Sequence, residues 1–167
     1  DQCFATVAAT ALAPATYSDN CIVTASSLYW SLSGATTGSG TGLMPQTIFS
    51  VGTTTVTYTI TDASSRTASC GFDVVVTDNI NPTITCVANM ALNVDAGKCY
   101  KTVANTALIP TISDNCTVTT SNLSWSMAGA TIGSGTGLIP TTDFNVGTTT
   151  VTYTITDAHG RTASCSF

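Results

Sequence analysis

Apolar residues alternate with Thr and Ser along several short stretches of the chain. Residues 56–61 are Val-Thr-Tyr-Thr-Ile-Thr, and the same alternation places Leu28, Trp30 and Leu32 on one face of an earlier stretch. A period of two residues puts alternate side chains on opposite faces of a β-strand. Each stretch is therefore predicted to be a half-buried strand with one apolar face and one polar face.

Two further alternating stretches lie in the middle of the chain. One contains Cys70 and every second residue up to Val76, and the other runs from Ile84 to Val94. Gly, Asp, Asn and Pro separate these stretches and are typical of tight turns. We expect strands throughout both segments.

A tandem repeat organises these strands. Residues 51–63 recur unchanged as residues 146–158, an offset of 146 − 51 = 95 residues. A unit of this length has the size of an immunoglobulin-like β-sandwich and is longer than the common helical repeats. We therefore predict an all-β fold of tandem immunoglobulin-like (Greek-key) β-sandwiches, with one repeat in residues 1–78 and the second in residues 79–167.

Composition excludes several classes of function. The net charge is −5 and only four residues are Lys or Arg, so a nucleic-acid partner is not expected. No apolar run reaches the roughly 18 residues that a membrane span requires. The single histidine, His159, is replaced by Ser64 in the first repeat, so no Ser-His-Asp or Cys-His arrangement recurs. We predict that the chain is not an enzyme.

Seven cysteines without a close CxxC pair indicate disulfides in preference to a metal site. Disulfides persist in oxidising compartments. The sequence therefore predicts an extracellular protein, either secreted or on the cell surface.

The repeated motif VGTTTVTYTITDAxxRTASCxF, followed by VTDNxxPTITC, resembles the hyalin repeat, or HYR domain, an immunoglobulin-like module. The resemblance covers both copies. It implies adhesion or matrix building in long extracellular arrays, and no catalysis. The four cysteines of the second repeat are similar to those of bacterial surface versions of the family.

Two functions remain open. The first is a structural or adhesive module of a long surface adhesin or extracellular filament, whose partners are neighbouring copies or repeats of the same protein. The alternative is a module that binds a glycan or a protein ligand through loops at one pole. The turn Thr61–Ala63 is shared by both copies, whereas specific binding loops usually differ, which favours the structural role.

The first and last residues of the sequence are not expected to coincide with the boundaries of complete repeats. Compared with the inter-repeat segment Gly71 to Lys98, the first repeat is expected to lack its opening strand and the second its closing strand after Phe167. A strand from a neighbouring chain would complete either domain by strand addition.

Two disulfide schemes are compatible with the sequence. Cys86 and Cys165 share the inward phases of the first and last strands of the second repeat, and both strands start at the same pole of such a sandwich. The preferred scheme is Cys86–Cys165, Cys99–Cys116 and Cys3–Cys21, with the partner of Cys70 outside the chain segment. The alternative joins Cys116 to Cys165 and Cys21 to Cys70, and leaves Cys3 unpaired.

Oxygen-bearing side chains gather at the expected entry pole of the second repeat. They come from the linker, the loop before Cys116 and the last hairpin: Asp78, Asn79, Asp114, Asn115 and Asp157. Hard cations prefer such ligands, so calcium is the one cofactor that the sequence indicates. The competing interpretation is that these residues cap backbone N–H groups in turns.

The Gly-Ser-Gly-Thr-Gly stretches at residues 38–42 and 133–137 lack the lysine and the following helix of a phosphate-binding loop. We expect flexible hairpin turns there. Trp30 and Trp125 share the phase of apolar neighbours and are predicted to lie in the core.

Overall fold

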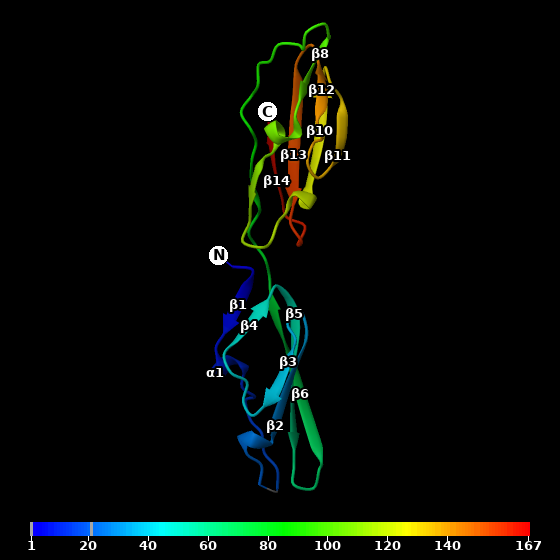
Figure 1. Cartoon of the computed structure of the whole chain (residues 1–167). Helices are drawn as coiled ribbons and strands as arrows, with labels where there is room; N and C mark the ends of the chain where they lie inside the picture. The colour runs from blue at the N-terminus through cyan, green and yellow to red at the C-terminus, as the bar shows by residue number, and fades with distance from the viewer. Residues whose placement is uncertain (1, 21) are drawn as a thin grey trace. The chain divides into compact units, whose positions relative to one another are not determined.

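The computed structural model describes residues 2–20 and 22–167, and the chain divides into two compact units, Asp1–Asp78 and Asn79–Phe167. Antiparallel β-strands are the main regular structure of each unit, while the longest helices among the described residues have four residues (Figure 1). The predicted all-β sandwich class is confirmed. Among the described residues, no helix is long and apolar enough to cross a membrane.

The first unit packs a two-stranded sheet, β1-β4, against a four-stranded sheet in the order β3-β2-β5-β6. The elements are β1 (Phe4–Val7), α1 (Ala9–Leu12), a 3-10 helix (Ala25–Ser27), β2 (Leu28–Gly34), β3 (Gly38–Thr41), β4 (Thr47–Ser50), β5 (Gly52–Thr61) and β6 (Thr67–Val76).

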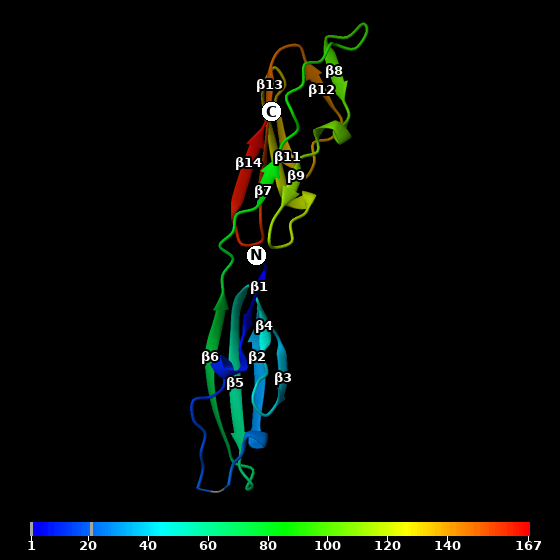
Figure 2. The same ribbon diagram turned by 90° about the vertical axis from the view of Figure 1, so that its left-hand side faces the viewer.

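The second unit repeats the four-stranded sheet in the order β11-β10-β13-β14 and covers it with two pairs, β12-β8 and β7-β9 (Figure 2). The elements are β7 (Thr83–Thr85), β8 (Tyr100–Val103), a 3-10 helix (Asn105–Leu108), β9 (Thr111–Ser113), a 3-10 helix (Thr120–Asn122), β10 (Leu123–Gly129), β11 (Gly133–Thr136), β12 (Thr142–Asn145), β13 (Thr149–Thr156) and β14 (Thr162–Ser166).

The alternating strand predicted around Val56 forms the centre of each core. Val56 and Tyr58 on β5 are buried, as are their copies on β13. The Tyr58 hydroxyl accepts a hydrogen bond from the Met44 amide at 2.9 Å, and the Tyr153 hydroxyl accepts one from the Ile139 amide at 3.1 Å. Burial raises the pKa of Tyr153. The same buried tyrosine thus ties the central strand to the loop after β3 in the first unit and to the loop after β11 in the second.

The last hairpin of each sheet is fixed by an aspartate. The Asp62 Oδ1 accepts hydrogen bonds from the Ser64 and Arg66 amides, both at 2.8 Å, and Asp157 repeats this pattern in the second unit. Ser65 occupies a position with φ of 64°, and its copy is Gly160 with φ of 81°. Glycine adopts this left-handed conformation without steric cost.

The strand predicted from Ile84 to Val94 is wrong beyond Thr85. Only Thr83–Thr85 pairs, with β9, and the following residues are extended without a ladder. Met90, Leu92 and Val94 are 41%, 53% and 49% exposed. Alternation predicts an extended backbone, but a strand also requires a hydrogen-bonding neighbour.

The glycine-rich stretches are strands, so the prediction of flexible turns is wrong. Gly38–Thr41 forms β3 and pairs with β2, with Gly40 opposite Trp30. A Cβ atom at Gly40 would lie 2.6 Å from the Trp30 ring, and one at Gly135 would lie 2.7 Å from the Trp125 ring. The glycines therefore make room for the half-buried tryptophans, which pack against the cores as expected.

Candidate functional site

A groove of about 510 Å³ lies in the second unit beside the start of β13. Its apolar lining comes from the extended segment after β7, from β8 and β12, and from the two strands of the main sheet. These residues include Met90, Leu92, Val94, Phe144, Val151 and Phe167. Three of them, Met90, Leu92 and Val94, are the exposed residues of the extended segment.

The first unit has a strand where the second unit has this groove. β6 pairs with β5 over ten residues and reaches Val76 opposite Gly52. Val74 and Val76 pack against the core of the first unit. In the second unit, β14 ends at Ser166, and the last pairing along this edge of β13 joins Val151 and Phe167 through two backbone hydrogen bonds of 3.0 Å.

The start of β13 consequently has an open edge. Antiparallel strands direct alternate amides to the same side, so the Thr149 amide faces the same edge as that of Val151. Among the described residues, no strand pairs with Thr149 there. Its copy Thr54 lies opposite Val74 and is fully buried, whereas Thr149 is half-buried.

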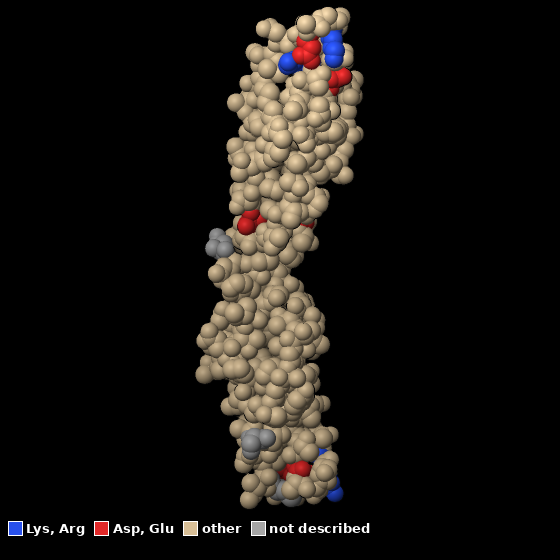
Figure 3. All heavy atoms as spheres, in the orientation of Figure 1, with Lys and Arg blue, Asp and Glu red and all other residues tan. Residues whose placement is uncertain are grey.

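The groove ends at a small charged cluster. Lys101, a lining residue on β8, places its Nζ 2.6 Å from the Asp95 Oδ1, and the Asp95 Oδ2 accepts a hydrogen bond from the Thr102 amide at 3.0 Å. The hydrogen bond from Lys101, together with that from Thr102, lowers the pKa of Asp95 to about 2. On the face drawn in Figure 3, charged side chains are few, and one group of them lies near β8.

Two of the predicted calcium ligands lie close together. Asp114 and Asp157 each offer a carboxylate oxygen, and these two oxygens lie within 4.8 Å of each other. Asp157 is 5% exposed and Asp114 is half-buried. Of the other predicted ligands, Asp78 is 8% exposed, Asn115 is half-buried and Asn79 is exposed.

Each of two carboxylates in this group uses one oxygen for the backbone. The Asp157 Oδ1 accepts the two hairpin amides, and the Asp114 Oδ2 accepts the Cys116 amide at 3.3 Å. The Asp157 Oδ2 and the Asp114 Oδ1 are buried without a hydrogen-bond partner. The turn-capping interpretation therefore accounts for one oxygen of each carboxylate but not for the other.

Cys116 and His159 also lie close to each other in the second unit. The sulfur of Cys116 is in a disulfide, however. It is not available as a thiolate ligand for a metal ion.

The structure changes the predicted disulfides. Cys86 and Cys165 are joined, with an S–S distance of 1.95 Å, as the preferred scheme has it. Cys99 is free and Cys116 is disulfide-bonded, so the predicted Cys99–Cys116 pair is wrong. Cys70 is free, as in the preferred scheme.

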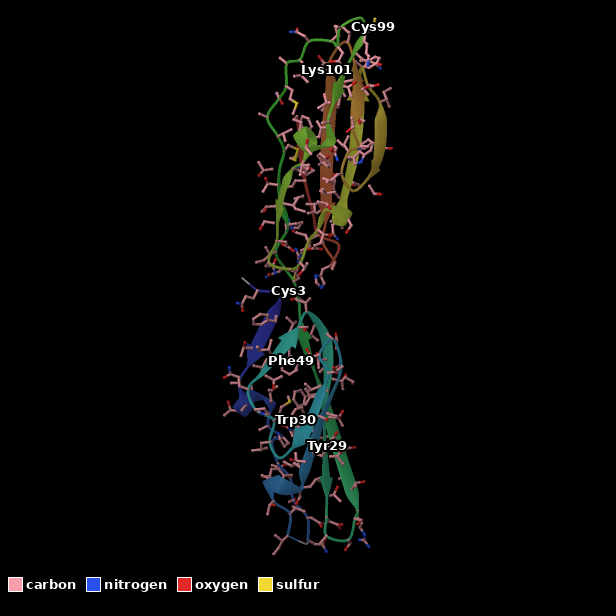
Figure 4. All side chains as sticks on the ribbon, in the orientation of Figure 1. Cys3, Tyr29, Trp30, Phe49, Cys99 and Lys101 are labelled. Carbon is pink, nitrogen blue, oxygen red and sulfur yellow. A yellow bond between two sulfur atoms is a disulfide. The ribbon has the colours of Figure 1, made fainter. Side chains whose placement is uncertain are left out.

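Distance explains the failure of the Cys99–Cys116 pair. The Cys99 carbonyl accepts a hydrogen bond from the Val146 amide, before β13, while Cys116 lies near His159, after β13. The eight residues of β13 separate these ends by about 26 Å. A disulfide requires Cα atoms less than about 7 Å apart. Figure 4 shows Cys99 beside Lys101 at the β8 end of the unit.

The alternative scheme is also wrong. Cys165 is bonded to Cys86, so it cannot pair with Cys116, and Cys70 is free. Cys3 is disulfide-bonded and therefore is not the unpaired residue of that scheme. The predicted Cys3–Cys21 and Cys21–Cys70 pairs involve Cys21, which lies outside the described residues.

Sequence reasoning did not predict the groove. The missing information was the course of residues 86–99, part of which lines its outer wall.

Two β-sandwich units with a shared sheet order, the second closed by the Cys86–Cys165 disulfide, define a tandem module of the extracellular, adhesion type. The chain belongs to the HYR domain family, which matches residues 16–76 and 77–167.

One relative is Hyalin from Strongylocentrotus purpuratus, which is 33% identical to this chain over 128 residues. The match covers 71% of this chain and 9% of that protein. The relative is an animal protein, so the match does not support the bacterial origin expected from the cysteines. No solved structure matches the chain.

Proposed function

We propose that this chain is a structural, adhesive module of a long extracellular surface protein or filament. The observation that carries the proposal is the repetition of one sandwich in tandem. Both units have the same four-stranded sheet order and the same buried tyrosine on the central strand, and the Cys86–Cys165 disulfide closes the second unit.

The proposal concerns a structural role and not recognition of a small ligand. A long array of such sandwiches spans distance and carries load, and a disulfide limits how far a repeat can extend. The hyalin relative, which is much longer than this chain, is compatible with such an array.

Single-molecule force spectroscopy on the full chain tests this function. We expect the Cys86–Cys165 disulfide, with a sequence separation of 79 residues, to keep most of the second repeat from extending under load. The double variant Cys86→Ser and Cys165→Ser should release that length.

Cys70→Ser is the matched control, because Cys70 is a free thiol in the first repeat, and it should leave the extension of both repeats unchanged. Equal extension with and without the Cys86–Cys165 disulfide would refute the proposed load-bearing role.

A further inference from the structure

Two aspartates of the second repeat share a buried position that the proposed function does not use. One oxygen of Asp114 and one of Asp157 lie within 4.8 Å of each other. We propose that Asp114 and Asp157 bind a hard divalent cation of the calcium class.

In each carboxylate the two oxygens have different surroundings, and this difference supports the site. Backbone amides hold the Asp157 Oδ1 and the Asp114 Oδ2. The other oxygen of each side chain is buried and has no hydrogen-bond partner. A buried carboxylate is costly unless it is paired or coordinates a metal, and Asp157 is 5% exposed.

The copies in the first repeat act as an internal reference. Asp62 accepts the same two hairpin amides as Asp157, but it is half-buried, and Asp19, the copy of Asp114, is exposed. The hairpin hydrogen bonds therefore form without full burial of the aspartate, and they use only one of its oxygens. At this hairpin position, a buried aspartate and a second oxygen without a partner occur together only in the second repeat.

The spacing suits one shared ion. Calcium takes oxygen ligands at about 2.3–2.6 Å, so two oxygens on one ion are at most about 5.2 Å apart. The carboxylates meet this limit. Six to eight ligands are usual for calcium, so water and neighbouring carbonyl oxygens would complete the shell.

Equilibrium dialysis of the full chain against ⁴⁵Ca²⁺ tests the site. We expect one bound ion per chain, with at least about tenfold weaker binding in Asp157→Asn. Asparagine keeps an oxygen that accepts the hairpin amides, so this variant should fold. Asp62→Asn removes the matching carboxylate from the first repeat and should leave the binding unchanged.

Thermal unfolding supplies an independent measurement. Millimolar calcium should raise the melting temperature of the second repeat, and EDTA should reverse the rise; Asp114→Asn should abolish the shift. The proposal is overturned if no ion binds at millimolar calcium, or if Asp157→Asn and Asp62→Asn reduce binding equally. Loss of this site would leave the extension limit set by the Cys86–Cys165 disulfide unaffected, so the two proposals fail separately.

Discussion

Thr54 and Thr149 occupy the same position in the two repeats, yet Thr54 is fully buried and Thr149 is half-buried. The sequence around them is identical from Val51 to Ala63 and from Val146 to Ala158. Their surroundings differ because β6 covers the first site and a groove borders the second. Two strands of identical sequence thus differ in solvent exposure because the residues that cover them differ.

The largest difference expected between the repeats concerns the disulfide. Cys86 and Cys165 close a loop with a sequence separation of 79 residues, which stabilises the native state by about 4 kcal/mol in the chain-entropy model. The double variant Cys86→Ser and Cys165→Ser should lower the free energy of unfolding of the second repeat by that amount. Native-state hydrogen exchange followed by mass spectrometry measures each repeat separately.

Cys70 provides the control for this experiment. It is the copy of Cys165 but is a free, exposed thiol. Cys70→Ser should leave the stability of the first repeat within about 0.5 kcal/mol of its original value. A loss as large as that of the double variant would show that the repeats depend equally on this cysteine position.

A smaller effect should be the same in both repeats. Gly40→Ala and Gly135→Ala each push a Cβ atom into a tryptophan ring, at 2.6 and 2.7 Å, and overpacking of this kind costs about 1–3 kcal/mol. Urea unfolding measures the loss. Gly38→Ala is the control, because its Cβ would meet ordinary contacts at 3.7 Å. Unequal losses at Gly40 and Gly135 would mean that the shared sheets are not packed alike.

These glycines show where sequence reasoning stops. The alternation in residues 56–61 predicted the central strand because its pattern is local. The contact between Gly40 and Trp30 joins neighbouring strands, so a glycine-rich stretch with low strand propensity resembled a turn. The Cys99–Cys116 pair failed for the same kind of reason, since it depended on the course of residues 86–99.

The smallest expected effect concerns acid stability. The pKa of Asp95 is about 2 in the folded chain, below its ordinary value of 3.8. A lowered pKa stabilises the folded state above the ordinary value, and this contribution is lost as the pH falls from about 4 towards 2. Asp95→Asn should therefore slightly destabilise the second repeat at pH 6 but not at pH 2. A stability gap that stays constant over this range in urea unfolding would contradict the assignment.

Amide hydrogen exchange at Thr54 and Thr149, each compared with Val56 or Val151 on the same strand, tests the central difference most directly. We predict that Thr54 exchanges nearly as slowly as Val56, while Thr149 exchanges at least about tenfold faster than Val151, because its edge is open. If Thr149 is as protected as Val151, the edge is not open and the account of the groove is wrong.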